Sequence, residues 1–408
     1  MLVTLIPLFD REMAVNAYSV FCQKENPFLN PLSMMSGQND APTDIAGLDL
    51  IRTMGLETLS DTSEIFIPVS NVSVFTDMDQ LTVGIPHERI VFLIDNSFPP
   101  IDMYVNRLKE LKDARYKLAI RGLAVADLMT FAPILTNVDY VLLNNKKIVI
   151  EKAKIFFAKL YPNIKLIAGN IEDQDTFDHL VETGGYDLYE GDFYRVPVTK
   201  GVHEVAPVKM NYLELLRTVN DADFELQDVA DIIGRDPALT IDLLKMVNRV
   251  VKTAEITTIR HAAAMLGQRE LKKWITTVVS EELYSDKPSE VTRLSLLRAR
   301  FAENLADAFG LKLHQEELFM MGLFSVLDVI LEKPMAEALD MIQVGGAIRS
   351  ALVDHEGDLA TILDFILAYE SADWAAVSKT LLLRKVDIDP IYEAYKESLT
   401  WYRMTTVG

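Results

Sequence analysis

Carboxylate side chains that could hold a divalent cation are few at the positions where this sequence predicts strand ends. Sites for hard cations need several oxygen ligands that converge on one point. The predicted strand ends supply a mixed set instead: Pro68, Asp95, Arg121, Gly122, Asn144, Gly169, Glu172 and Glu190. Because Arg121 adds a positive charge to so few acids, we expect solvated loop carboxylates here, with no bound metal and no cofactor.

Two groupings of histidine with glutamate offer weaker ligand sets. His314 stands near Glu316 and Glu317, and His355 stands beside Glu356. Neither grouping brings three ligands together, which a structural or catalytic metal would need. We therefore expect both groupings to lie on the surface.

Basic residues cluster in one part of the second half and could form a strip that binds a nucleotide, a nucleic acid or an acidic partner. The members are Lys245, Arg249, Lys252, Arg260, Arg269, Lys272 and Lys273. The whole chain carries 60 acidic and 40 basic residues, a formal charge of −20. Such a charge disfavours nucleic acids and anionic membranes. We therefore expect a solvated helix face, and no nucleic acid or membrane as a partner.

Composition excludes further classes of protein. Cys22 is the single cysteine, so neither an intramolecular disulfide nor a cysteine-based metal cluster can form. The first ten residues lack the basic region and long apolar run of a signal peptide. No apolar stretch reaches the roughly 18 residues of a membrane helix. We expect a cytoplasmic protein.

Residues 1–200 alternate between short β-rich runs and helical stretches. Strands buried on both faces that alternate with helices are typical of a parallel sheet with crossover helices. About seven such units in this length favour a closed TIM-type β/α barrel over an open sheet. In the helix predicted at 101–113, we expect Met103, Val105, Leu108 and Leu111 to face inward. Strands are predicted at 3–8, 14–21, 64–69, 89–94, 117–120, 140–143, 165–168 and 188–189.

After a predicted linker at 201–207, β-rich runs disappear and helices follow one another. The clearest helix starts at Asp236, whose carboxylate can cap the first turn, with Pro237 at the first helical position. We predict α/β plus all-α architecture, with a barrel over 1–203 and an all-helical domain over 204–408. The helices are predicted near 208–219, 225–234, 237–250, 256–266, 268–284, 291–309, 314–331, 334–343, 346–353, 358–369, 372–382 and 388–402.

Five stretches of the first half are similar to those of a known family: PLFDR at 7–11, YSVFCQ at 18–23, KLAIRGL at 117–123, LIAGNIE at 166–172 and LYEGDFYRVP at 188–197. With them, the first half resembles a divergent branch of the EAL family of cyclic di-GMP phosphodiesterases. These stretches run along the whole of residues 1–200. The resemblance implies a TIM-type barrel.

The same resemblance implies that most functional positions are changed. The family has metal-binding carboxylates and an asparagine, a lysine and a phosphate-binding arginine where this chain has Ser19, Gln23, Pro68, Arg121, Gly122, Leu142 and Gly169. Glu172 matches an acidic family position, and Asp95 and Glu190 are the other acids near the predicted strand ends. Two-metal hydrolysis depends on bound ions. The resemblance therefore implies the fold, with the activity lost and cyclic di-GMP binding in doubt.

The second half resembles the HDOD domain, a relative of HD phosphohydrolases that usually lacks their catalytic residues. The similar stretches are DPALTIDLLKMVN at 236–248, ITTIRHAAAMLG at 256–267 and RARF at 298–301. An HD site would place its His-Asp pair where this chain has Ser325 and Val326, and valine cannot bind a metal. The candidate contact residues for a partner are Asp242, Lys245, Asn248 and Arg260.

Together these observations predict a bacterial signal-transduction protein that is not an enzyme and acts by binding other signalling proteins. Two alternatives stay open. The first is a sensor that binds cyclic di-GMP or a similar nucleotide without hydrolysing it. The second is a residual metal-dependent phosphodiesterase that depends on Glu172. The sequence leaves the partner, the pathway and the oligomeric state open, and an oligomer is possible.

Overall fold

The computed structural model describes residues 1–23, 45–144, 148–196, 207–221, 223–250, 256–283 and 289–406. Contacts divide the chain into two compact units. The barrel unit comprises Met1–Val196, Asn304–Lys312 and Phe365–Gly408, and the helical unit comprises Pro197–Glu303 and Leu313–Asp364. Residues 201–206 of the predicted linker and the boundary after residue 203 lie outside the described ranges, and Pro207, the last residue of that linker, begins a helix. The 1–203 and 204–408 division stays a prediction, and the contacts group the C-terminal helices with the barrel.

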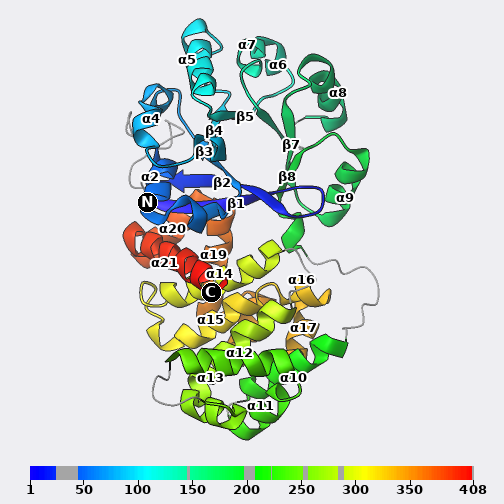
Figure 1. The fold of residues 1–408 in the computed structure, drawn as a ribbon, viewed down its shortest axis with the longest axis vertical. Coiled ribbons are helices and arrows are strands. Elements are labelled where there is room, and N and C mark those ends of the chain that lie inside the picture. Colours follow the sequence, from blue (N-terminus) through cyan, green and yellow to red (C-terminus); the bar gives the residue numbers. More distant parts are fainter. Residues whose placement is uncertain are drawn as a thin grey trace. The chain divides into compact units, whose positions relative to one another are not determined.

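Eight strands close into a barrel in chain order, and Figure 1 labels most of them. Strand β1 pairs antiparallel with both β2 and β8, and the other neighbours are parallel. The predicted α/β barrel followed by helices is therefore confirmed. The strands are β1 (Leu2–Phe9), β2 (Val15–Gln23), β3 (Glu64–Pro68), β4 (Ile90–Asp95), β5 (Lys117–Arg121), β6 (Tyr140–Asn144), β7 (Lys165–Ile171) and β8 (Leu188–Gly191).

Side chains from all eight strands fill the barrel interior. We call seven of them, one from each of β2 to β8, the core layer: Ala17, Phe66, Leu93, Ala119, Tyr140, Ile167 and Leu188. Because successive strand residues point to opposite faces, residues two positions away from this layer also point inward. The core layer therefore fixes which side chains reach the open end of the barrel.

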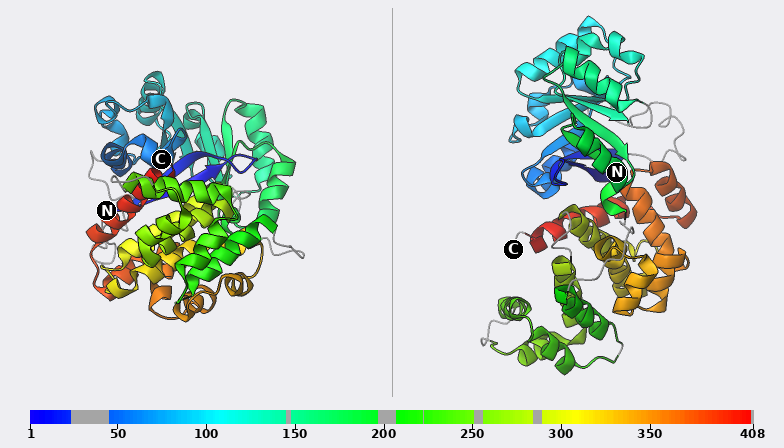
Figure 2. Two further views of the ribbon diagram at one scale, coloured as in Figure 1. Left: turned by 60° about the horizontal axis from the view of Figure 1, so that its bottom comes forward. Right: turned by 90° about the vertical axis from the view of Figure 1, so that its right-hand side faces the viewer.

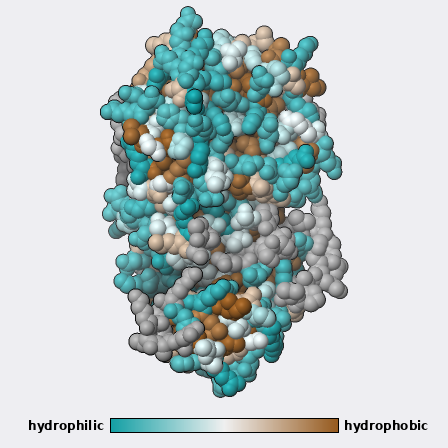
Figure 3. Space-filling model, viewed as in Figure 1, coloured by the Kyte–Doolittle hydropathy of each residue, from teal (hydrophilic) through white to brown (hydrophobic). Residues whose placement is uncertain are grey.

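Helices cover the outside of the strands, as Figure 2 shows. In α5, Val105, Leu108 and Leu111 are buried as predicted, but Met103 is 55% exposed, so that part of the prediction is wrong. Residues two apart on a helix do not share a face, so Met103 cannot join the stripe that begins at Val105. Hydrophilic residues dominate the surface over α5 in Figure 3. The helices are α2 (Ala46–Met54), α3 (Leu56–Ser60), α4 (Met78–Leu81), α5 (Asp102–Asp113), α6 (Asp127–Thr130), α7 (Ala132–Leu135), α8 (Ile150–Leu160) and α9 (Gln174–Thr183).

The helical unit contains the helix that the Asp236 cap predicts. The Asp236 carboxylate accepts hydrogen bonds from the backbone N–H groups of Ala238 and Leu239, at 2.8 and 3.2 Å. The two helices predicted at 256–266 and 268–284 form α13, which is interrupted at Gly267 with φ of 76°. The helices are α10 (Pro207–Asn220), α11 (Leu226–Ile233), α12 (Pro237–Val250), α13 (Ile259–Leu283), α14 (Ser289–Leu305), α15 (Gln315–Phe324), α16 (Leu327–Leu331), α17 (Met335–Ile342) and α18 (Gly346–Arg349).

The predicted helix 314–331 is divided between α15 and α16. The Ser325 hydroxyl donates to the carbonyl of Gly322 at 2.6 Å, and Val326 has φ of −125°. A serine that bonds back to the preceding turn competes with continued helix. Among the described residues, no helix has both the length and the apolar character to cross a membrane.

Three C-terminal helices complete the chain: α19 (Asp358–Glu370), α20 (Trp374–Arg384) and α21 (Ile388–Thr406). Within the barrel unit, they satisfy polar groups of the first two strands. The backbone N–H of Val3 donates to the Tyr369 hydroxyl at 3.1 Å, and the Gln23 amide donates to Ser378 at 3.2 Å. β1 pairs with β8 at a single residue pair, so most of that side of β1 resembles the edge of a sheet. Without the Tyr369 hydroxyl, the N–H of Val3 would lack an acceptor there.

We predict that Tyr369→Phe destabilises the chain by about 1–3 kcal/mol, because it leaves the buried N–H of Val3 without an acceptor. The free energy of unfolding from urea denaturation measures the loss. Tyr392→Phe is the matched control, since no hydrogen bond joins the Tyr392 hydroxyl to the described residues. Equal stability of Tyr369→Phe and the control would contradict the role given to the Val3 bond.

Candidate functional site

The open end of the barrel is lined by seven residues that we call the mouth layer. They are Ser19, Pro68, Asp95, Arg121, Leu142, Gly169 and Glu190. Each follows a core-layer residue by two positions on its own strand, so each points inward at the carboxyl end. The structure thus brings these seven predicted positions together. Carboxyl ends of barrel strands are where barrel enzymes place their active sites.

Three other predicted residues lie elsewhere. Gln23 is bonded to Ser378 of α20. Gly122 has φ of 79°, a left-handed conformation in which an aspartate would be strained. Glu172 follows the end of β7 and is exposed to solvent. Of the three acids predicted near the mouth, Asp95 and Glu190 belong to it, and Glu172 does not.

Arg121 is the positive centre of the mouth layer. Its guanidinium lies over the ring of Phe21, 5.0 Å from the ring centroid. Burial lowers the pKa of the Arg121 guanidinium, and the negative charges of Glu190 and Asp95 counteract part of that effect. An arginine stays protonated in such a site. The mouth therefore holds a desolvated cation between two acids.

Glu190 is the acid whose ionisation the barrel controls most. Burial raises the pKa of its carboxyl from 4.5 to about 7, Arg121 opposes the rise, and Asp192 adds to it. Its Oε2 atom is buried and accepts no hydrogen bond from the described residues, and the buried hydroxyl of Ser19 is likewise without a partner among them. Buried polar atoms normally have a partner, from the protein, from water or from a ligand. Two buried polar atoms of the mouth layer are thus left unsatisfied by the described residues.

Between Arg121 on β5 and Glu190 on β8, the mouth is apolar and tightly packed, because Leu142 on β6 and Gly169 on β7 lie there. A Cβ atom at Gly169 would lie 2.8 Å from Cδ2 of Leu142, closer than such contacts occur. The resemblance places a lysine at 142 and a glutamate at 169. Leu142 instead occupies the space that a side chain at 169 would need, so the two replacements depend on each other.

The mouth layer does not fit the metal pair that the family resemblance implies. A cationic Arg121 stands near Asp95 and Glu190, and Pro68, Leu142 and Gly169 offer no side-chain ligand. Within the described ranges, no three His, Cys, Asp or Glu side chains come together as a metal-binding group. The absence of a metal nevertheless stays a prediction.

In the helical unit, the residues at the HD position take part in packing. Val326 is 1% exposed, and the Arg298 guanidinium donates to the Ser325 hydroxyl at 3.1 Å. Burial raises the pKa of nearby Asp328, while backbone N–H groups and the Arg298 charge oppose the rise. Gly322 permits this arrangement, since a Cβ atom there would lie 2.5 Å from the Arg298 carbonyl. Sequence reasoning used Arg298 only as part of the RARF stretch and missed its interaction with Asp328, because the two residues lie 30 positions apart.

The candidate partner-contact residues are already engaged within the unit. Lys245 lies 3.7 Å from Asp242, and Arg260 lies 3.5 Å from Asp231, all with exposed side chains. The Asn248 side-chain amide donates to the carbonyl of Ile256 at 2.9 Å and accepts a hydrogen bond from the Ile256 N–H at 2.8 Å. The Arg249 side chain and Lys252 lie outside the described part of the chain. The partner role of these residues stays a prediction.

The histidine groupings lie on the surface, as predicted. His314 interacts with Glu317, and its side chain is 50% exposed. His355 lies 3.0 Å from Asp364, and its side chain is 54% exposed. Each histidine thus has one acidic neighbour rather than a ligand set.

Comparison with known proteins connects these features to a family. Residues 206–344 match the HDOD domain. The chain is 28% identical over 327 residues to "Cyclic di-GMP phosphodiesterase CdgJ" of Vibrio cholerae serotype O1, which covers 79% of this chain and 75% of that protein. It is 25% identical over 410 residues to "Uncharacterized protein YuxH" of Bacillus subtilis, covering 97% and 96% of the two chains. The predicted relationship to EAL–HDOD proteins is confirmed.

A solved structure of a standalone EAL protein from Vibrio cholerae O395 in its cyclic di-GMP-bound form is also similar. The sequence identity is 16%, the TM-score is 0.36, and the match covers 50% of this chain and 95% of that one. The Vibrio relative with 28% identity is named as an enzyme. That name contradicts the prediction that this chain is no enzyme, and the prediction is withdrawn.

We predict that Gly169→Ala destabilises the barrel by about 1–3 kcal/mol, because the new Cβ overpacks against Leu142. In a double-mutant cycle with Leu142→Ala, the combined loss should fall short of the sum by about 0.5–3 kcal/mol. Urea denaturation measures the four chains. Gly346→Ala is the control, since no atom lies within 4 Å of its added Cβ. Additive losses would show that the two positions are independent.

We predict that Glu190→Gln stabilises the chain at alkaline pH. The folded-state pKa of about 7 lies above the ordinary 4.5, so ionisation of Glu190 costs stability as pH rises through this window. The gain should be absent below pH 4.5 and reach on the order of 3 kcal/mol above pH 7. Urea denaturation from pH 4 to 9 measures it, with the exposed Glu182→Gln as control. A gain that does not change with pH would refute this account.

Proposed function

We propose that this chain is a signal-transduction protein of cyclic di-GMP signalling. Its residues 206–344 match the HDOD domain, and its first half is a β/α barrel. The barrel mouth binds the phosphodiester of a cyclic dinucleotide, and the helical unit contacts other signalling proteins. The observation that carries the proposal is the desolvated Arg121 guanidinium in the mouth layer.

The chemistry of the mouth supports a ligand that carries a phosphate group. A guanidinium donates paired hydrogen bonds to phosphate oxygens, and its charge gains strength where water is excluded. The unpartnered Ser19 hydroxyl can donate to the same group. Below about pH 7, Glu190 is neutral, so Asp95 alone opposes the Arg121 charge.

The name of the Vibrio relative supports the choice of nucleotide. That protein is a cyclic di-GMP phosphodiesterase by name, and it covers 79% of this chain. If hydrolysis also occurs here, the mouth acids Asp95 and Glu190 are the residues that it would require, since Glu172 is exposed and outside the mouth layer.

Partner recognition by the helical unit is a second component, and the surface of α12 favours it. Asp242 and Lys245 are more than half exposed, and Ile241 beside them is 50% exposed. An exposed apolar side chain among charged ones is suited to a protein contact that combines burial with charge pairing.

We predict that the full chain binds cyclic di-GMP in isothermal titration and that Arg121→Ala weakens binding about tenfold or more, because a charge-assisted contact is lost. Arg115→Ala is the matched control, since Arg115 is 81% exposed, lies before β5, and changes the net charge equally. Incubation with Mg²⁺ or Mn²⁺, followed by chromatography, tests for turnover in parallel.

Three outcomes decide the proposal. Selective loss with Arg121→Ala supports it, whether or not the nucleotide is hydrolysed. Equal binding by both variants would remove Arg121 from the site. No measurable heat and no turnover would overturn the nucleotide part and leave partner recognition to be tested by capture on wild-type and Lys245→Glu chains.

A further inference from the structure

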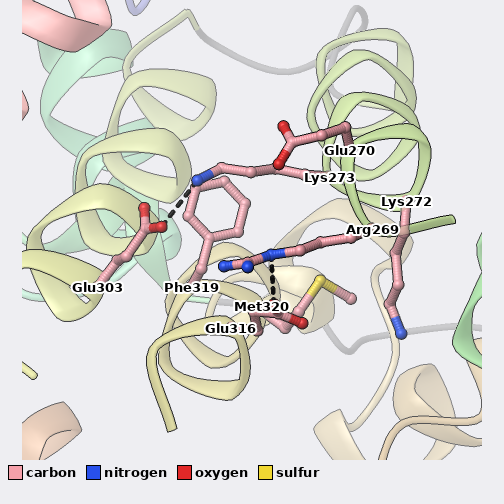
Figure 4. A pocket seen from close by; sticks show the side chains of 8 residues that line it. All are labelled: Arg269, Glu270, Lys272, Lys273, Glu303, Glu316, Phe319 and Met320. Carbon is pink, nitrogen blue, oxygen red and sulfur yellow. Dashed lines mark hydrogen bonds and ion pairs between the residues drawn. The ribbon is translucent and has the colours of Figure 1, made fainter. Parts of the chain in front are cut away.

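The helical unit has a small pocket between α13, α14 and α15, which Figure 4 shows from close by. Its cavity volume is about 60 Å³, which corresponds to roughly four water molecules. Phe319 and Met320 form an apolar floor and are only 3% and 7% exposed. The pocket is separate from Ser325 and Val326, the HD position, neither of which lines it.

Two ion pairs build the walls of the pocket. Arg269 lies 2.7 Å from Glu316, and Lys273 lies 2.7 Å from Glu303 while its amine is 4.9 Å from the centroid of Phe319. These pairs connect α13 to the two neighbouring helices. The walls are therefore held in place by charges that already compensate each other.

Lys272 is the cation of the pocket lining that belongs to neither of these two ion pairs. No described carboxylate lies within ion-pair distance of its amine, and in Figure 4 the amine stands apart from both dashed pairs. Burial lowers the pKa of Lys272, and the charge of Glu316 opposes that effect. A desolvated amine without a counterion gains most from an anion brought to it.

Charge balance selects the kind of anion. Glu303 accepts from Arg300 as well as from Lys273, so it is shared between two cations. The remaining acid of the lining, Glu270, together with Glu316 and Glu303, would repel a doubly charged group. A single negative charge is the complement of the one unpaired amine, and the floor of Phe319 and Met320 suits an apolar stem.

We propose that this pocket binds a carboxylate carried on an apolar stem, with Lys272 as its counterion and Phe319 and Met320 as the floor. Two sources present this chemistry, a free small carboxylic acid and the carboxyl terminus of a peptide. The proposal does not depend on nucleotide binding in the barrel.

Butyrate is the first probe, because it is a carboxylate on a short apolar stem. In the full chain, butyrate should slow acylation of Lys272 by an N-hydroxysuccinimide ester, measured by peptide mass spectrometry, at least threefold at saturation. Lys245, an exposed lysine that already faces Asp242, is the internal control and should react equally with and without butyrate. Sodium chloride at the same ionic strength controls for screening.

Variants and competing anions complete the test. In amide NMR titrations, Lys272→Gln should weaken butyrate binding at least fivefold, and Lys245→Gln should leave it unchanged. A peptide ending in Ala-Leu with a free carboxyl terminus, compared with its amide, separates the two sources. Equal binding by Lys272→Gln, no protection by butyrate, or stronger protection by inorganic phosphate would each overturn the proposal.

Discussion

The alternation of side chains along the barrel strands is the constraint on which the candidate site depends. Once Ala17, Phe66, Ala119 and their neighbours fill the core layer, the residues two positions further on have no other direction than inward. The mouth layer is therefore positioned by packing below it and not by its own chemistry. A barrel of this kind can exchange the residues at its mouth without losing the geometry that brings them together.

The exchanges at the mouth are not independent of one another. Leu142 fills the space beside Gly169, so the apolar side of the mouth is packed by a pair of replacements. On the neighbouring strand β5, Arg121 stands where the resemblance implies an aspartate, and its charge moderates the rise in the pKa of Glu190. A cation placed among acids disfavours a bound metal ion, while the strand geometry stays the same.

The sequence predicted the features that depend on local patterns. Asp236 caps its helix, and the strands follow their apolar runs. It failed where distant segments meet. Nothing near Val3 indicates that Tyr369 would satisfy its N–H, and the Gln23 bond to Ser378 is equally non-local. Met103 was misplaced because an apolar residue was counted toward a helix face that its spacing excludes.

The prediction that the changed ligands abolish activity is contradicted by the name of the Vibrio relative. Residue types at the mouth determine which charges are present, whereas activity also depends on what the bound molecule brings with it. The buried Ser19 hydroxyl and the Glu190 oxygen lack partners among the described residues, and such atoms are costly unless something satisfies them. An apolar replacement at position 19 or 190 would remove this cost without disturbing the core layer beneath, so packing alone does not explain why both positions are polar.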